Sequence, residues 1–252
     1  MCGRYALTAT PEEVRRMFGY EDQPNFPPRY NIAPTQPIAL VSLEHGARRF
    51  MLARWGLIPG WVKDPAGFTL LINARAETAA EKPAFRGAMR HRRVIIPASG
   101  FYEWRRGDGG GKRAYWIRPR DRGIVGLAGL METYMSADGS EIDTAAILTV
   151  EANRLVAMIH DRMPAVLSPD QFEAWLDVRG REPREVQGLL RPAANDLFEA
   201  IAVSDRVNTV RNDDEGLQQP ADAATDRPAP TRKGRAGGPG SDTAGGGQMS
   251  LF

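Results

Sequence analysis

Residues 92–104, RRVIIPASGFYEW, are the stretch from which the fold can be read. The apolar run 94–96 predicts a buried strand, and the alternating segment 101–105 predicts a second one. Pro97 and Gly100 mark a turn between the two segments. Short strands separated by turns in this way are typical of an antiparallel sheet.

The same pattern continues on both sides of this stretch. Two short helices are predicted after capping sequences that begin at Thr10 and Ser168, each with Pro in the first helical position. We therefore expect an α+β domain with an antiparallel, barrel-like sheet core and short peripheral helices. No βαβ alternation or internal repeat is visible. The further predicted strands are 38–43, 49–55, 114–117, 124–130, 145–150 and 200–203.

Composition excludes several classes of protein. The 252 residues are 42% hydrophobic and 25% charged, as in ordinary globular proteins. No apolar run reaches the roughly 18 residues that a membrane helix needs, and no secretory signal is present. One cysteine excludes an intrachain disulfide, so we expect a cytoplasmic protein. Residues 212–252 carry a net charge of −2, so residues 1–211 carry +4, which is compatible with nucleic-acid binding.

The composition changes near residue 212. Residues 212–247 contain eight Gly, four Pro and no aromatic residue, which predicts a disordered linker after a single domain at 1–211. The last five residues, 248–252, are apolar again and read as a docking peptide at the end of a tether. Its residues are Gln248, Met249, Ser250, Leu251 and Phe252.

Cys2 is the most informative single residue. Methionine before a small residue is normally removed, which would leave an α-amine and a thiol on adjacent carbons. Both groups titrate within about two units of neutral pH. Such a 1,2-aminothiol condenses with an aldehyde to an imine, and the thiol then closes a thiazolidine ring. Alternatively, an N-terminal Cys can attack an amide with its own amine as the base.

Two further residues are candidates for the chemistry, each with a plain structural alternative. His160 is a natural proton carrier near neutral pH, or a structural histidine. Glu103 lies among aromatic residues beside a Pro/Gly turn, where burial would raise its pKa, or it is an exposed strand residue. Asn73 can cap a helix that carries Arg75 and Glu77, which accounts for it without any chemistry. One Cys and three scattered His do not match metal-ligand spacing, so no metal and no other cofactor is expected.

Taken together, these motifs resemble one family, the SOS-response-associated peptidase (SRAP) family of abasic-site shielding proteins. The matches occur in the family's order and span residues 2 to about 210. They are MCGR at 1–4, NIAPT at 31–35, WGLIP at 55–59, NARAE at 73–77, the stretch 92–104, HDRMP at 160–164, and Val203-Ser204 with Val207-Asn208.

The resemblance implies a reaction and a substrate. Cys2, freed of Met1, would capture the aldehyde of an abasic site in single-stranded DNA as a thiazolidine crosslink that shields the lesion in the DNA damage response. Asn73, Glu103 and His160 match the family's other active-site positions. An imine intermediate also permits β-elimination, so slow lyase activity is expected, and removal of Met1 by the protein itself would be a peptidase activity.

The resemblance also points to a DNA surface. Arg4, Arg75 and Arg162 stand beside the proposed active-site residues and are expected to contact phosphates. Trp61 and Trp104 are expected to stack on bases next to the lesion, which is sequence-tolerant.

The C-terminal peptide at 248–252 carries a second resemblance. It looks like the Gln-Leu-Ser-Leu-Phe peptide by which bacterial repair proteins dock on the sliding clamp, with Met249 in place of Leu. A tether of 36 residues would span roughly 30–36 Å and raise the local concentration of the domain near clamp-loaded DNA.

Two other functions share these residues. One is a cysteine-type peptidase or amidohydrolase with Cys2 as an N-terminal nucleophile and Glu103 or His160 as the base. The other is a non-catalytic, clamp-tethered module that binds single-stranded DNA, with Cys2 inert. A single-lesion covalent mechanism needs no second subunit, so a monomer is expected.

Overall fold

The computed structural model describes residues 2–107 and 111–221, and five of its strands close into a barrel. They are β3 (Pro37–Glu44), β4 (Ala47–Trp55), β6 (Arg93–Ala98), β9 (Val125–Met135) and β10 (Glu141–Glu151). Around the ring, β4 pairs with β3, β3 with β6, β6 with β9, and β9 with β10, all antiparallel. Antiparallel neighbours run in opposite directions, and a closed ring with an odd number of strands cannot keep this alternation all the way round. The closing pair, β4 and β10, is accordingly parallel.

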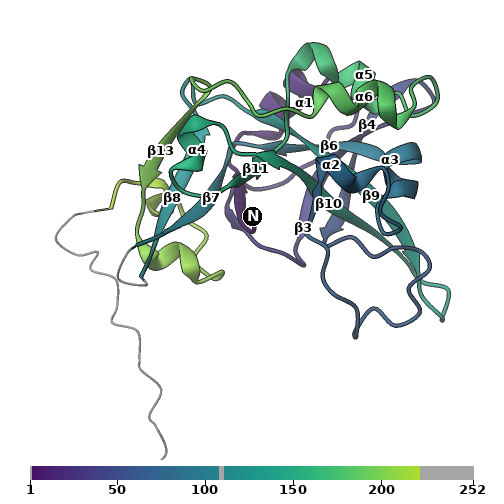
Figure 1. Ribbon diagram of the computed structural model, residues 1–252, viewed down its shortest axis with the longest axis horizontal. Coiled ribbons are helices and arrows are strands. Elements are labelled where there is room, and N and C mark those ends of the chain that lie inside the picture. The colour runs from purple at the N-terminus through teal and green to yellow at the C-terminus, as the bar shows by residue number, and fades with distance from the viewer. Residues whose placement is uncertain (1, 108–110, 222–252) are drawn as a thin grey trace, which may run out of the picture.

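A second, fully antiparallel sheet lies beside the barrel. Its order is β13 (Phe198–Ala202), β8 (Lys112–Pro119), β7 (Gly100–Arg106), β1 (Tyr5–Leu7) and β2 (Arg29–Ile32). Figure 1 shows this sheet and the barrel on either side of the N-terminal segment, which therefore enters the molecule between them.

The stretch 92–104 connects the two sheets, because β6 belongs to the barrel and β7 to the second sheet. At the junction, the Ser99 hydroxyl accepts the Thr8 N–H at 2.9 Å and the Ser99 N–H donates to Ala6 at 2.8 Å. Gly100 follows, and a Cβ there would meet the Ile117 carbonyl at 2.5 Å. Only glycine permits this close approach of β7 to β8, which positions the residues that follow.

Short strands and helices complete the fold. The edge strands β5 (Asn73–Arg75) and β11 (Arg162–Pro164) pair with β10, and β12 (Val166–Leu167) pairs with β9. Figure 1 shows α1, α5 and α6 together along one side of the molecule. The helices are α1 (Pro11–Phe18), α2 (Ala76–Ala79), α3 (Arg86–His91), α4 (Arg154–Ala157), α5 (Phe172–Leu176) and α6 (Pro183–Val186), with 3-10 turns at Pro169–Gln171, Gln187–Leu189, Asp205–Asn208 and Glu215–Gln218.

The structure confirms the predicted fold class and each of the eight predicted strands. The capping box at Thr10 and the Ser168 cap are also present. Two predictions are wrong. Asn73 lies in β5 and caps no helix, because the N-cap of α2 is Arg75, which makes no side-chain cap.

The other wrong prediction is the end of the domain at residue 211. Leu217 is fully buried, and the Asp213 carboxylate accepts hydrogen bonds from the backbone of Tyr30 and Asn31. The folded domain therefore reaches at least Ala221, whose N–H pairs with Ala202. Leu217 belongs to a buried cluster with Tyr102 of β7 and Trp116 of β8, so one apolar residue holds this polar stretch on the second sheet. No described helix is long and apolar enough to cross a membrane.

Candidate active site

Cys2 lies fully buried just before β1. The Asn73 amide donates to the Cys2 carbonyl at 2.8 Å, and the Cys2 thiol faces the Arg4 carbonyl at 3.6 Å. Asn73 reaches this position because β5 pairs in parallel with the barrel strand β10, Asn73 opposite Ile147. A strand of the barrel thus brings an amide side chain to the start of the chain, 71 residues away.

Glu103 is the buried carboxyl of this site, with 2% of its surface exposed. Burial raises its pKa, and electrostatic interactions with the N-terminal amine and with His160 partly oppose that effect. Burial, reinforced by the charge of Glu103, raises the pKa of the Cys2 thiol. Glu103 on β7 is therefore close enough to act on Cys2, just before β1, and on His160, just before β11.

The tautomer of His160 follows from its neighbours. The Arg162 N–H donates to Nδ1 at 3.0 Å, while the Asp161 carboxylate lies 2.8 Å from the same nitrogen. Nδ1 can serve only one of these partners. The Arg162 N–H is fixed in β11 and the Asp161 side chain is mostly exposed, so we assign the acceptor role to Nδ1 and the proton to Nε2.

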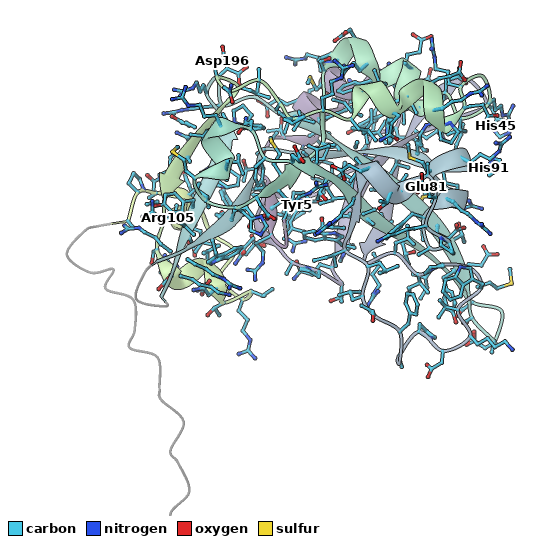
Figure 2. The ribbon with its side chains drawn as sticks, viewed as in Figure 1. Tyr5, His45, Glu81, His91, Arg105 and Asp196 are labelled. Carbon is cyan, nitrogen blue, oxygen red and sulfur yellow. The ribbon has the colours of Figure 1, made fainter. Side chains whose placement is uncertain are left out.

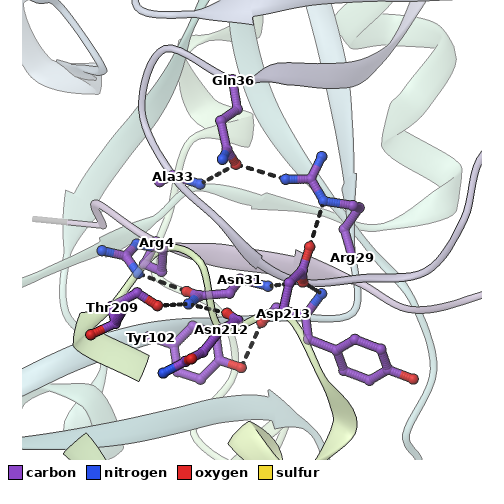
Figure 3. A network of polar contacts seen from close by, with 10 residues as sticks. Arg4, Arg29, Asn31, Ala33, Gln36, Tyr102, Thr209, Asn212 and Asp213 are labelled. Atoms are coloured by element: carbon purple, nitrogen blue, oxygen red, sulfur yellow. Dashed lines mark hydrogen bonds and ion pairs between the residues drawn. The ribbon is translucent and has the colours of Figure 1, made fainter. Parts of the chain in front are cut away.

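A polar network anchors the segment that carries Cys2 (Figure 3). The Arg4 guanidinium donates at 2.7 Å to the Asn31 side chain. It also donates at 2.7 Å to the Val207 carbonyl. The buried Asn31 amide in turn donates to the carbonyls of Thr209 and Asn212 (Figure 3) and to that of Val207. Asn31 lies in the motif 31–35, and the sequence alone indicates no role for it. Its contacts lie some 180 residues away in the chain, where no local pattern reveals them.

The predicted DNA contacts separate into two groups. Arg75 is exposed, and Trp61 is 60% exposed with its ring edge-on to Phe68. Trp104 is half-buried beside Arg4, and its indole N–H donates to Asn208 at 2.8 Å. These residues remain candidates for DNA contact.

Arg162 differs, because its guanidinium is already occupied. It forms two hydrogen bonds of 2.8 Å with the Glu77 carboxylate and one of 2.5 Å with the Thr149 carbonyl, and its side chain is only 9% exposed. The Arg162 guanidinium is therefore not available as a phosphate contact. Here it is a structural residue that ties α2 to β10 and β11, next to His160.

Replacing Glu77 with Gln is expected to lower the stability at neutral pH by about 1 kcal/mol, because Glu77 is half exposed and solvent screens the pair. The hydrogen bonds from Arg162 lower the pKa of Glu77. The stability that the Glu77–Arg162 pair contributes is therefore complete above the unfolded-state pKa of Glu77, about 4.3. It is lost as the pH falls through the lower folded-state pKa.

Thermal unfolding of both proteins between about pH 3 and pH 8 measures this effect. The difference in melting temperature should stay constant above about pH 5 and close on acidification. Glu81→Gln, at an exposed position just after α2, is the control. A difference that persists unchanged at about pH 3 would contradict the ion-pair explanation.

Nothing in the described residues forms a metal centre, since no group of three or more His, Cys, Asp or Glu lies together there. Figure 2 shows His45 and His91 at the opposite edge of the molecule from Arg105, which is on β7 with Glu103. The predicted clamp peptide at 248–252 lies outside the described residues.

The family model described as "SOS response associated peptidase (SRAP)" matches residues 1–210. The chain belongs to the SRAP family. A Bacillus subtilis SRAP relative, "Abasic site processing protein YoqW", is 37% identical over 84% of this chain and 96% of its own length. "Abasic site processing protein YedK" of Escherichia coli is 33% identical over 87% of this chain and 100% of its own.

A chicken relative of this SRAP protein, "Abasic site processing protein HMCES", is 34% identical over 84% of this chain and 76% of its own length. A crystal structure of a Bacteroides thetaiotaomicron protein matches with a TM-score of 0.78 and 26% identity, over 87% of this chain and 100% of that one. The match to the family model and the match to a solved structure therefore agree on the fold of this chain.

Proposed function

We propose that this protein captures abasic sites in single-stranded DNA as a covalent adduct through Cys2, after Met1 is removed. The observation that carries the proposal is the meeting of four residues from separate segments: Cys2 and Glu103, which are buried, and Asn73 and His160, which are half-buried. The names of the relatives, which are abasic site processing proteins, agree with this substrate.

The reaction balances with the groups present. The α-amine of Cys2 attacks the C1′ aldehyde of the ring-opened sugar and forms a carbinolamine. Glu103 protonates the hydroxyl, water leaves, and an iminium ion remains. The Cys2 sulfur then bonds to C1′ while its proton passes to the Glu103 carboxylate. The product is a thiazolidine, and the only molecule lost is one water.

The environment of each residue suits its role. The raised pKa of Glu103 favours the protonated form that an acid needs near neutral pH. The Asn73 amide, bonded to the Cys2 carbonyl, orients the nucleophile. His160 with its proton on Nε2 is a donor for the ring oxygen of the sugar as the ring opens. Arg4, Arg75, Trp61 and Trp104 are proposed to hold the strand, and residues 248–252 to dock on a sliding clamp.

Intact-mass spectrometry with an oligonucleotide that holds one abasic site tests the proposal. We expect a chain without Met1 that gains the oligonucleotide mass minus one water, and no gain for Cys2→Ala. Loss of Met1 without an adduct would reject the crosslink in favour of the N-terminal-nucleophile amidohydrolase, which shares Cys2. Retained Met1 without an adduct would leave only a DNA-binding module.

A further inference from the structure

An apolar pocket of about 270 Å³ lies where the second sheet meets the barrel. Leu7 of β1 and Ile32 of β2 line it from the second sheet, while residues 37–39 of β3 and Leu52 of β4 line it from the barrel. The segment 25–27, before β2, completes the lining. Eight of the ten lining residues are apolar, and none of the four candidate active-site residues is among them. The pocket is therefore a separate site that the proposed reaction does not use.

The walls of this pocket present apolar side chains to solvent. Leu52 is 58% exposed, and Pro27 and Pro37 are exposed as well. The ring of the half-buried Phe26 is held in place by Phe50, on which it stacks with centroids 5.6 Å apart and planes 5° apart. A cavity of this size is smaller than the roughly 300–1,000 Å³ of small-molecule sites. It therefore suits one or two side chains of a peptide.

The charge in the pocket is already balanced. Arg29 is the only charged residue among those that line it. Its Nε donates to the Asp213 carboxylate at 2.8 Å, and its Nη2 donates to Gln36 at 2.7 Å (Figure 3). A phosphate backbone needs uncompensated cations to bind. The pocket thus favours a neutral, apolar segment over a nucleic-acid strand.

The chain itself carries such a segment at residues 248–252. Met249, Leu251 and Phe252 are apolar, and none of the five residues has a charged side chain. An aromatic ring entering the pocket would meet Phe26, and aromatic pairs attract each other beyond the area that they bury. The segment matches the pocket in both polarity and size.

The segment can also reach the pocket. The described chain ends beside β13, where the Ala221 N–H pairs with Ala202. In the five-stranded sheet, β13 and β2 are the two opposite edges. Four strand spacings of about 4.8 Å put these edges roughly 19 Å apart. Residues 222–247 form a Gly-rich tether whose composition predicts a span of roughly 25–31 Å. The tether therefore covers the distance at a millimolar effective concentration.

We propose that residues 248–252 dock into this pocket of their own chain, with Phe252 against Phe26 and Leu251 against Leu52. At an effective concentration of about 1 mM, a pocket affinity of about 0.1 mM keeps about nine chains in ten closed. Docking hides the segment that is proposed above to bind a sliding clamp, so a clamp must compete with the pocket. Only this regulatory consequence rests on the proposed clamp docking, because the closed state itself needs neither clamp nor DNA.

Photo-crosslinking of the whole chain tests the proposal. The photoreactive residue p-benzoylphenylalanine replaces Phe252, and mass spectrometry after irradiation and digestion locates the crosslinks. We expect them within one chain, at residues 25–27 or 50–52. Leu52→Glu should lower their yield roughly tenfold, because docking would bury its carboxylate against an apolar ring. Leu251→Glu should do the same, and it changes no contact of the described residues.

Met135→Glu is the matched control, because Met135 is 60% exposed on β9 and does not line the pocket. Its crosslink yield should stay within about twofold of the wild type. Leu52 is also mostly exposed, so the melting temperatures of both variants should equal that of the wild type.

Three results would overturn the proposal. Crosslinks scattered over the surface, or a yield that neither Leu52→Glu nor Leu251→Glu lowers, would mean that the segment does not occupy the pocket. Crosslinks that join two chains on a denaturing gel would assign the pocket to a second copy. None of these results involves the abasic-site reaction, whose failure would appear separately in the mass measurement with the oligonucleotide.

Discussion

Replacing Glu103 with Gln is expected to slow formation of the covalent adduct by roughly 100- to 10,000-fold, the usual contribution of a general acid or base. The amide keeps the size of the carboxyl group but cannot give a proton to the leaving hydroxyl or take one from the thiol. Glu103 is almost fully buried, so solvent water is a poor substitute. Single-turnover kinetics with an abasic oligonucleotide, followed by denaturing gel, measure the rate.

The same substitution should make the protein more stable at neutral pH. Burial raises the folded-state pKa of Glu103 above its unfolded value, so the stability contributed by the neutral acid is complete below about pH 4.3 and is lost as the pH rises through the folded-state pKa. Glu103→Gln has no such loss. Its melting temperature should equal that of the wild type near about pH 4 and exceed it at about pH 8.

Opposite effects on rate and stability distinguish a functional carboxyl from a structural one. The exposed Glu21→Gln is the control and should change neither quantity. An adduct rate within about threefold of wild type for Glu103→Gln would remove Glu103 from the mechanism. A lower melting temperature at about pH 8 would mean that its carboxylate stabilises the fold.

Replacing Asn31 with Ala is expected to cost about 3 kcal/mol or more. The side chain is 1% exposed. Its loss removes one of the two acceptors of the Arg4 guanidinium and the side-chain donor to the carbonyls of Thr209 and Asn212. Each unsatisfied buried group costs about 1–3 kcal/mol. For a domain of this size, the melting temperature should fall by roughly 6–12 °C.

Thermal unfolding by circular dichroism measures this effect, and Asn25→Ala, at an exposed position in the same region of sequence, is the control. The adduct rate, measured well below the melting temperature, should also fall for Asn31→Ala, because Arg4 holds the segment that carries Cys2. A fall in stability below about 1 kcal/mol would show that water replaces the amide in the network.

Several features were predictable from local sequence because their cause is local. The strands flanking Gly100, the capping box at Thr10 and the short helix after Ser168 each follow from residues within a few positions of one another. The short strands β1, β2 and β5 were missed because three or four residues of mixed polarity carry no periodicity, and only their barrel and sheet partners make them strands.

The candidate site shows the same division. Cys2, Asn73, Glu103 and His160 were selected from motifs, and the roles proposed for them remain predictions. The partners of Arg162 and Asn31 were not predictable, because Glu77 and the segment 207–212 reach them through pairings across 85 to about 180 residues. The positive charge of Arg162 suggested phosphate binding until its neighbours were known.

Residue types and local order therefore specify the family, the strand segments and the reactive groups of this protein. Secondary-structure propensity, helix capping and the alternation of apolar and polar residues all act within one helical turn or one strand. The register of β5 on β10, the burial that raises the pKa of Glu103, and the anchoring of Arg4 arise only when the barrel closes. Desolvation and hydrogen-bond partners depend on what surrounds a group in space, and long-range strand pairing decides those surroundings.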